Sequence, residues 1–598
     1  MERINVILTW PLWDTLVYNC KSAPPAGSRV LVPLGKSKRV GFVLDKSDKE
    51  LPDDIKVRDV IEIIDTQRVI DADLWDMALW AGKLCMCGAG EVLNLILPKK
   101  FLSGEKVDSY TSPDNYKKMR LGGEVCFYSP LDSERVKFYR EELAKPGRVL
   151  MMLPSHKRAR SFFSSLPEKL KHEAILWPSS VAGLGARLWE AWKLAHSKQV
   201  RIIVSAPNGI FAPLSPERFI IEDEASPSYI IPYKINISAR DLAARRANFL
   251  GSEFITGGSL PSLRTFMNSR PKQEVKPDRK NIIIADMNCS FKEESRGIKG
   301  TIPLTRSLIK RTYKALANDR NVIWILNRLG DSSEIFCENC GESLRCPKCN
   351  NLMRSESEGF IIMLRCRVCG NVINMPDKCG HCGSDFLIGR KPGLEALFNI
   401  AKKYFNDVHI YSETSKVQDM HGLILSTNRG LELCSKINPG LIAWLDIDSE
   451  LSYPDYNTKF NLFTRIWDSY WRGRKQKSDR KILLQARKSG RIFASSFLDG
   501  WGWEKFFTGE LRIRQEYELP PYGFMFEISC SDKKLREDVI NNLDSKGLFI
   551  MDPGEGSEKL YVNTKSYESV YEALKSFYSV GKKTKTYPDK ILISIRSE

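Results

Sequence analysis

The sequence predicts a multidomain α/β protein with a metal-binding insert, and three observations lead to this fold class. The chain has 598 residues, which is too long for a single hydrophobic core. Apolar, strand-like runs alternate with helical stretches along its middle, a pattern typical of parallel sheets flanked by helices. Four Cys-x-x-Cys pairs lie within 46 residues, and their eight thiolates are enough for two tetrahedral zinc sites.

The same patterns divide the chain into segments. Short apolar runs around a turn-rich stretch at 23–27 indicate a β-rich start, and the polar stretch at 103–121 reads as a linker. The strand and helix alternation occurs twice, which predicts two lobes. We therefore expect an N-terminal β-rich domain at 1–102, a linker at 103–124, a first lobe at 125–299, a second lobe at 300–518 with a zinc-binding insert at 331–388, and a C-terminal α+β domain at 519–598.

The spacing of the cysteines bears on how they share metal ions. The four pairs are Cys337/Cys340, Cys346/Cys349, Cys366/Cys369 and Cys379/Cys382. The 16 residues between Cys349 and Cys366 suit a zinc ribbon closed by the two inner pairs, which leaves the outer pairs for a second ion. A pairing of the first pair with the second is tight but not impossible. All-cysteine sites leave no open coordination position, so these metals are expected to fold a module rather than catalyse.

A disulfide framework is the alternative explanation for these cysteines, and it requires an oxidising compartment. The first twenty residues lack the basic and apolar regions of a secretory signal, and the chain has no apolar stretch of membrane-spanning length. We therefore expect a reduced protein of the cytoplasm, associated with the nucleoid and without a membrane partner.

The charge balance is basic and favours a polyanionic partner. The chain has 91 Lys and Arg against 73 Asp and Glu, a net charge of +18. Zinc knuckles beside such a charge favour nucleic acid over an ordinary solvated surface. The segment 465–475 (RIWDSYWRGRK) places aromatic rings between cations, so Arg472 and Arg474 are candidate DNA-binding residues, although the rings could equally be packed in a core.

Several motifs, in this order, resemble the PriA family of primosomal replication restart helicases over nearly the whole chain. They are 239–243 (ARDLA), 327–330 (NRLG) ahead of the cysteines, 391–395 (KPGLE) after them, 445–449 (LDIDS) and 519–522 (LPPY). The resemblance implies two RecA-like helicase-type lobes and two Zn²⁺ ions in the nested pairing. The implied ligands are Cys337, Cys340, Cys379 and Cys382 for one ion, and Cys346, Cys349, Cys366 and Cys369 for the other.

The N-terminal segment is similar to the domain that binds the 3′ end of a nascent strand in this family. The similarity lies in 29–36 (RVLVPLGK) and 40–43 (VGFV), and it makes Tyr18 and Lys36 candidate DNA-binding residues. Residues 16–18 (LVY) stand where the family has Phe-Asp-Tyr, so an acidic residue of the 3′-end pocket is missing. The partners implied are forked or branched DNA, primosome and replicative helicase-loading proteins, and the single-stranded DNA-binding protein.

The nucleotide site of the family is not matched. A P-loop requires a glycine-rich cradle, a Lys for the phosphates and a Ser or Thr for magnesium. At that place the chain reads FYSPLDSERVKF over 127–138, with Asp132 in the position of the phosphate-binding Lys. The sequence Gly-Lys-Ser at 35–37 lacks the glycine five residues earlier and lies in the N-terminal domain.

Other helicase motifs depart in the same direction. The family's Asp-Glu-Glu-His has become Glu-Asp-Glu-Ala at 222–225, Gly-Ser-Ala-Thr-Pro has become GGSLP at 257–261, and only 472–474 (RGR) remains near the arginine-finger motif. The linker at 103–121 is also too short for the winged-helix domain of helicase-active relatives. In these respects the chain is similar to shortened, P-loop-less members from actinobacteria.

The sequence therefore predicts a replication restart protein that binds stalled or branched forks and initiates primosome assembly by recruiting the replicative helicase. It predicts no catalytic residues and no helicase activity. The chain would be a pseudo-ATPase of the helicase family, because it lacks the P-loop. One alternative is an ATP-dependent 3′–5′ DNA helicase with a divergent nucleotide site that holds magnesium through the acids at 222–224. Another is a zinc-ribbon module that acts in RNA metabolism or transcription.

Overall fold

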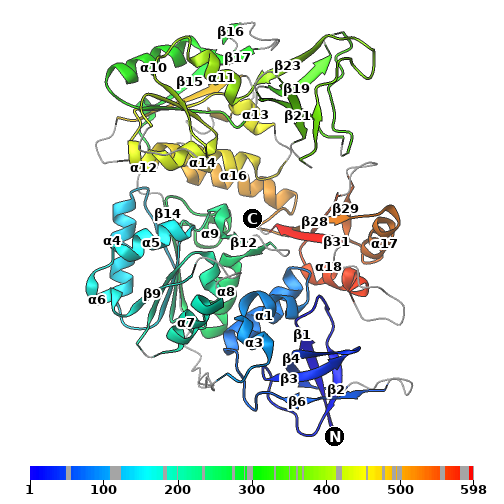
Figure 1. The fold of residues 1–598 in the computed structure, drawn as a ribbon. Helices are drawn as coiled ribbons and strands as arrows, with labels where there is room; N and C mark the ends of the chain where they lie inside the picture. The colour runs from blue at the N-terminus through cyan, green and yellow to red at the C-terminus, as the bar shows by residue number, and fades with distance from the viewer. Residues whose placement is uncertain are drawn as a thin grey trace. The chain divides into compact units, whose positions relative to one another are not determined.

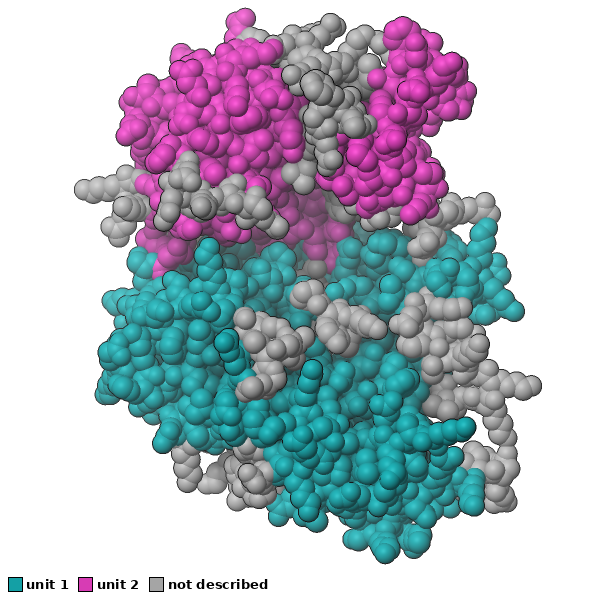
Figure 2. Space-filling model, viewed as in Figure 1, with its two compact units in different colours: residues 1–128, 133–271, 511–598 teal, residues 129–132, 272–510 magenta. Residues whose placement is uncertain are grey.

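A computed structural model describes most of the chain and divides it into two compact units. The first unit comprises residues 1–128, 133–271 and 511–598, and the second comprises 129–132 and 272–510 (Figure 2). The described residues are 1–48, 56–107, 123–178, 185–197, 199–231, 236–272, 276–287, 290–292, 301–328, 332–337, 339–348, 350–358, 361–366, 370–412, 420–452, 455–474, 479–487, 490, 493–494, 502–552, 559–578 and 591–596.

The N-terminal part of the first unit is a six-stranded sheet with the order β5-β2-β1-β4-β3-β6. Its strands are β1 (Glu2–Leu8), β2 (Leu16–Cys20), β3 (Arg29–Leu34), β4 (Ser37–Lys46), β5 (Arg58–Asp59) and β6 (Glu62–Ile63). Strands β3 and β4 form a tight hairpin in which Leu34 pairs with Ser37. Gly35, at the turn, has a φ of +60°, a value that suits glycine because it has no Cβ.

Three helices follow this sheet: α1 (Ala72–Leu84), α2 (Ala89–Ile96) and α3 (Lys99–Ser103). Their buried faces belong to one core that also includes residues of the first lobe and of the C-terminal part of the chain. The guanidinium of Arg246 ties α1 to that lobe, because it lies 2.6 Å from the carboxylate of Asp73 and both side chains are fully buried. The helices of the N-terminal part therefore dock on the rest of the first unit.

The first lobe is an all-parallel sheet with the order β7-β14-β11-β8-β10-β9. Its strands are β7 (Glu124–Tyr128), β8 (Val149–Met152), β9 (Ala174–Leu176), β10 (Ile202–Ser205), β11 (Arg218–Glu222) and β14 (Glu253–Gly258). The short strands β12 (Ile230–Ile231) and β13 (Ile237–Ser238) form a separate pair. Strands β8 and β10 are buried throughout and apolar except for Ser205 at the end of β10, as is usual for a parallel sheet covered on both faces.

Helices cover both faces of this sheet (Figure 1). Val149 and Met151 of β8 pack with α4 (Asp132–Ala144) and α5 (His156–Ser164) on one face. Leu150 and Met152 pack on the other face with α7 (Gly185–His196) and α8 (Ala239–Leu250). The remaining helices are α6 (Glu168–Lys171) and α9 (Leu263–Ser269). Alternate residues of one strand thus face opposite helical layers.

The second unit is built on another all-parallel sheet, with the order β15-β27-β26-β18-β25-β24. Its strands are β15 (Ile282–Asp286), β18 (Val322–Ile325), β24 (Val408–Ile410), β25 (Leu423–Ser426), β26 (Leu441–Trp444) and β27 (Lys481–Ala486). Its helices are α10 (Arg306–Ala317), α11 (Leu394–Ala401), α12 (Cys434–Ile437), α13 (Ile447–Leu451) and α14 (Thr458–Trp471). Helix α16 (Trp503–Glu516) begins in this unit, and its residues from Leu511 onward belong to the first unit. The strands β16 (Ser290–Lys292) and β17 (Thr301–Thr305) form an antiparallel pair.

The cysteine insert interrupts this second lobe between β18 and α11. It is a five-stranded sheet with the order β22-β21-β20-β19-β23. Its strands are β19 (Ser332–Cys337), β20 (Met353–Glu358), β21 (Ile361–Cys366), β22 (Val372–Asn374) and β23 (Leu387–Pro392). Strand β19 pairs with β23, so the first and last strands of the insert lie side by side (Figure 1). The two ends of the insert are thereby brought together.

The C-terminal part of the chain is an antiparallel sheet with two helices. The sheet has the order β29-β30-β28-β31 and comprises β28 (Phe524–Cys530), β29 (Phe549–Met551), β30 (Lys559–Thr564) and β31 (Ile591–Arg596), with α17 (Lys533–Asp544) and α18 (Tyr567–Leu574). Two parallel α/β lobes, an N-terminal β-rich part, an insert and a C-terminal α+β part confirm the predicted fold class. No helix in the described ranges is long and apolar enough to cross a membrane.

Candidate metal centre and nucleic-acid interface

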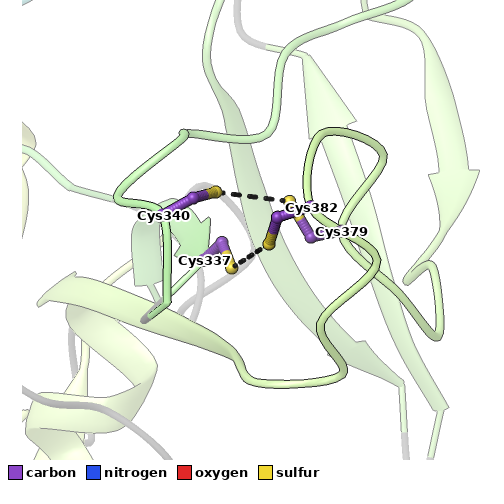
Figure 3. A group of neighbouring side chains, drawn as sticks. All are labelled: Cys337, Cys340, Cys379 and Cys382. Atoms are coloured by element: carbon purple, nitrogen blue, oxygen red, sulfur yellow. Dashed lines mark hydrogen bonds between the residues drawn. The ribbon is translucent and has the colours of Figure 1, made fainter.

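Four cysteines of the insert lie together although two of them stand about forty residues from the others in the sequence. The Sγ atoms of Cys337, Cys340, Cys379 and Cys382 are all within 4.8 Å of one another (Figure 3). The pairing of β19 with β23 causes this, because Cys337 ends β19 and Cys379 and Cys382 precede β23. The cluster could hold a metal ion.

The distances in the cluster fit a tetrahedral zinc site rather than a disulfide. The Sγ atoms of Cys337 and Cys382 are 3.6 Å apart, and those of Cys340 and Cys379 are 3.7 Å apart. A zinc–sulfur distance of about 2.3 Å places the corners of a tetrahedron about 3.8 Å apart. A disulfide would need a separation of about 2.0 Å. The spacing of the four thiols is therefore compatible with metal ligands and too long for disulfides.

The backbone turns tightly at each outer knuckle. The N–H of Gly341 donates to the carbonyl of Cys337, and Gly383 does the same to Cys379, each over 2.9 Å. The N–H of His381 points at the Sγ of Cys379, 3.4 Å away. The backbone N–H of Cys340 and the neighbouring thiols lower the pKa of the Cys337 thiol to about 6, although burial opposes this. The backbone N–H of Glu342 acts to lower the pKa of Cys340, but burial and the neighbouring thiols leave it raised to about 12. Cys337 is therefore the more readily deprotonated of these two thiols, as metal binding requires.

Of the other four predicted ligands, Cys349 and Cys369 lie outside the described residues. Cys346 and Cys366 are both buried in the small core of the insert. The N–H of Gly370 donates to the carbonyl of Cys366 over 3.1 Å, in the turn that the outer knuckles also use. The side-chain amide of Asn371 lies 3.8 Å from the Sγ of Cys346, so the two inner knuckles are neighbours.

The turn after the first strand of the first lobe is short and contains no glycine. Strand β7 ends at Tyr128 and α4 begins at Asp132, which leaves three residues between them, Ser-Pro-Leu. No glycine occurs between Gly123 and Gly147. A P-loop uses a longer glycine-rich turn so that several backbone N–H groups can point at the phosphates.

The acids that follow β11 are engaged by arginines of the same lobe. Glu222 accepts from Arg135 of α4 over 3.0 Å and from Arg158 over 3.2 Å, and Tyr139 also donates to it. Arg158 also binds Asp223 over 3.0 Å. Glu222 and Arg135 are both about 95% buried, so this is an internal ion pair.

The third acid is held in the same way. The carboxylate of Glu224 lies 2.7 Å from the guanidinium of Arg240, and it accepts from the hydroxyl of Tyr128 over 2.8 Å and from the backbone N–H of Ser262 over 2.7 Å. Burial, followed by the charge of Glu224, raises the pKa of Tyr128 well above its usual value, which keeps this donor protonated. A divalent cation at this edge would have to displace arginines that are already bound.

The LDIDS motif forms a comparable network in the second lobe. Asp446 accepts from Arg328 over 2.9 Å and from Arg487 over 3.0 Å. Asp448 accepts the backbone N–H groups of Arg487 and Gly490, over 2.6 and 2.7 Å. Arg328 follows β18, the LDIDS motif follows β26, and Arg487 and Gly490 follow β27. Asp446 and Asp448 therefore join these three segments at the carboxyl edge of the sheet.

The two N-terminal candidates for DNA binding have different surroundings. The Tyr18 side chain is buried, and its hydroxyl donates to the carbonyl of Pro33 over 3.0 Å. Lys36 is exposed at the turn between β3 and β4. Arg58 binds the carbonyl of Gly35 in the same turn over 2.8 Å. Lys36 is thus placed to contact a solvent-borne ligand, whereas Tyr18 supports the hairpin.

The two candidate DNA-binding residues in the second lobe, Arg472 and Arg474, follow α14 and contact side chains of that helix. Arg472 lies 2.6 Å from Asp468, one turn earlier in α14. The guanidinium of Arg474 lies 4.0 Å from the centre of the Tyr470 ring, and burial lowers its pKa. The rings of this segment pack in the lobe; Trp467 and Tyr470, for example, are buried.

Sequence reasoning overlooked the arginines that neutralise the acids of the first lobe. Arg135 lies in the stretch at 127–138 and Arg240 in the motif at 239–243, so both were visible as residues but not as partners of Glu222 and Glu224. It also overlooked the exposed ring of Trp10 beside Arg39 in the N-terminal part. An isolated tryptophan in an apolar stretch is no signal by itself, since most such rings are buried.

A protein with two parallel-sheet α/β lobes, a four-thiol cluster and a β-rich N-terminal part is thus defined by the fold and the site, and the chain is similar to replication restart proteins. Residues 5–98 match the profile of the 3′DNA-binding domain (3′BD) of PriA. The replication restart protein PriA of Borreliella burgdorferi is 21% identical over 547 residues, which cover 83% of this chain and 81% of that protein. PriA of Haemophilus influenzae is 22% identical over 651 residues, covering 88% and 87%. These findings confirm the resemblance to the PriA family over most of the chain.

Solved structures give a weaker likeness. RecG bound to a three-way DNA junction has a TM-score of 0.34 and 6% identity, covering 66% of this chain and 44% of that chain. The yeast protein Dbp5 bound to RNA and ADP BeF3 has a TM-score of 0.32 and 10% identity, covering 66% and 89%. Likenesses at this level carry no argument about function.

Proposed function

We propose that this chain is a replication restart protein that binds stalled or branched replication forks and initiates primosome assembly by recruiting the replicative helicase. The observation that carries this proposal is the match of residues 5–98 to the 3′DNA-binding domain, within relatives named PriA that cover most of the chain. Because forks of any sequence need restarting, recognition would rest on phosphate contacts and shape rather than on base sequence.

The proposal includes two structural Zn²⁺ ions in the insert. The cluster of Cys337, Cys340, Cys379 and Cys382 supports the first ion, and the buried pair Cys346 and Cys366 supports a second ion shared with Cys349 and Cys369. Both ions would hold the insert together, because four thiolates leave no coordination position for a substrate. The insert would then present a surface to primosome proteins, to replicative helicase-loading proteins or to the single-stranded DNA-binding protein. Its place would be the cytoplasm, at the nucleoid.

The proposal also holds that the chain has no helicase activity of its own. Two features of the first lobe support this: the three-residue turn before α4, and the arginines that neutralise Glu222, Asp223 and Glu224. A nucleoside triphosphate would lack the backbone N–H groups that usually bind its phosphates, and Mg²⁺ would lack accessible carboxylates. The lobes would then serve as a scaffold for the DNA-binding and zinc-binding parts.

One experiment tests both parts of the proposal. Fork-binding affinity and ATP hydrolysis are measured for the zinc-loaded protein, with forked DNA, linear duplex and an RNA hairpin. We expect a clear preference for the fork and no hydrolysis stimulated by DNA. Stimulated turnover would reveal a working motor, and equal binding to the RNA hairpin would favour a role in RNA metabolism instead.

A further inference from the structure

The N-terminal sheet exposes one large aromatic ring at its surface. Trp10, which follows β1, has 43% of its surface exposed, and it is the only exposed tryptophan in the part of the chain that the structure describes. The nearby Trp13 shows the usual behaviour, since it is buried and stacks on Tyr571 and Tyr578. An exposed indole leaves apolar surface in water, and core packing does not account for its position.

The ring of Trp10 is paired with a cation rather than with apolar neighbours. The guanidinium carbon of Arg39 lies 5.5 Å from the ring centre. Leu8, the last residue of β1, pairs with Gly41 of β4, so Trp10 just beyond the strand end comes near Arg39, which precedes Gly41 by two residues. The cation orients the indole while part of the ring stays open to solvent.

Other cations lie at the end of the same hairpin. Lys36 and Lys38 are exposed at the hairpin end, and Lys38 pairs with Pro33 one position before Arg39, so the side chains of Lys38 and Arg39 leave opposite faces of the strand. Arg58 is fixed there by its hydrogen bond to the carbonyl of Gly35. An exposed ring beside several cations matches the two needs of single-stranded nucleic acid, which are a flat surface for a base and positive charge for its phosphates.

We propose that Trp10 and Arg39 form a stacking platform for an unpaired base of single-stranded DNA, with Lys36, Lys38 and Arg58 contacting the phosphates on either side. The inference rests on the proposed function and specifies which part of a fork the N-terminal sheet holds, namely a single-stranded arm. This platform does not depend on an acid at residues 16–18, where the chain has Leu-Val-Tyr. A base of any kind would fit, because stacking uses the face that all bases share.

The test compares two single strands of about twelve nucleotides, within the range that small β-domains of this kind bind, one normal and one with abasic sites throughout. Binding to the full zinc-loaded chain is followed by the anisotropy of a 5′ dye. The variants are Trp10→Ala and Trp10→Phe, with Phe549→Ala as a matched control, since Phe549 is a ring on β29 that is 68% exposed. Trp10→Ala is expected to weaken binding of the normal strand roughly 5- to 100-fold.

The control results make the outcome specific. Trp10→Phe should recover most of the affinity, Phe549→Ala should change nothing, and the abasic strand should bind all variants and the unchanged protein alike. An unchanged affinity of Trp10→Ala, or an equal loss for the abasic strand, would overturn the platform. A Trp10→Ala effect confined to capture of a protein partner would also overturn it.

The same variants separate this inference from the proposed function. A fork with fully double-stranded arms has no unpaired base, so Trp10→Ala should bind it as well as the unchanged protein does. If forks are preferred over linear duplex while Trp10→Ala binds every substrate normally, the platform fails and the proposed function stands. If forks are not preferred by any form of the protein, the proposed function itself fails.

Discussion

The carboxyl edge of the first lobe and the β3–β4 hairpin both gather cations, but these cations face different surroundings. At the lobe edge, Arg135 and Glu222 are about 95% buried and bind each other. At the hairpin, Lys36, Lys38 and Arg39 are exposed to solvent. Charges of the first kind stabilise the fold, because each has a partner in the protein, whereas charges of the second kind are available to an external polyanion.

The same kind of residue therefore has two different roles, which depend on whether a carboxylate lies beside it. In the first lobe, arginines occupy the acids where a divalent ion would otherwise be held. Under the proposed function, the contacts to nucleic acid would come from the small N-terminal sheet, where the cations are accessible.

Removal of metal from the insert should have the largest effect, and it tests whether the hairpin alone accounts for binding of single-stranded DNA. Cys379→Ser is expected to release the metal and unfold the insert, because structural zinc contributes roughly 10–16 kcal/mol to the folding of small zinc modules. Metal content and hydrogen exchange in the insert measure this loss.

The control for that experiment is Cys126→Ser, which changes a half-buried thiol of the first lobe. Both variants should keep the affinity of the unchanged protein for single-stranded DNA. A large loss of this affinity in Cys379→Ser would show that the insert, and not only the hairpin, holds the strand.

Loss of the buried ion pair between Arg135 and Glu222 in the first lobe should have the next largest effect, on the free energy of unfolding. Arg135→Ala leaves the carboxylate of Glu222 with fewer partners, and breaking a buried pair in this way costs about 3–5 kcal/mol of unfolding free energy. Urea unfolding measures it. Lys137→Ala, on an exposed position of the same helix, should cost less than about 0.5 kcal/mol. Similar costs for the two variants would contradict the contrast between the two regions.

The exposed cations of the hairpin should behave in the opposite way. Lys36→Ala and Lys38→Ala are expected to leave the unfolding free energy within about 0.5 kcal/mol and to weaken binding of single-stranded DNA. Each lost phosphate contact should lower the slope of log affinity against log salt by about 0.7. Anisotropy titrations over a salt series measure the slope, and Lys534→Ala on α17 is the control. An unchanged slope in both hairpin variants would place the phosphates elsewhere.

The smallest effect concerns Glu450, a partly buried acid of the second lobe that also has Arg465 at 3.8 Å. Burial raises the pKa of Glu450, and the side-chain amide of Asn327 is its neutral partner over 2.9 Å. Because the folded-state pKa is above the unfolded value, the cost of burying the charge is fully present above the folded-state pKa and is relieved as pH falls through it. Glu450→Gln should therefore gain stability relative to the unchanged protein at pH 7, and this gain should shrink toward pH 4 in urea titrations. A gain that grows on acidification would contradict this assignment.

Much of the fold was predictable because its signals are local. Buried runs such as Val149–Met152 and Ile202–Ser205 have the continuous apolar character of parallel strands, and the Cys-x-x-Cys spacing indicates knuckles without any tertiary information. The domain boundaries proposed from sequence remain predictions. In the structure, residues 511–598 group with the N-terminal part and the first lobe, through buried contacts such as Trp13 with Tyr571 that no local pattern reveals.

By itself, the sequence determined the α/β class, the cysteine pairs, the basic charge and the lack of a glycine-rich turn before α4, because each depends on neighbouring residues. Only the tertiary structure decided which charges are neutralised and which are offered to a ligand. Arg135 and Arg39 look alike in the sequence, yet one faces Glu222 across the core and the other lies over Trp10 at the surface. Their partners are far apart along the chain or on a neighbouring strand, so strand order and packing, rather than local pattern, set their roles.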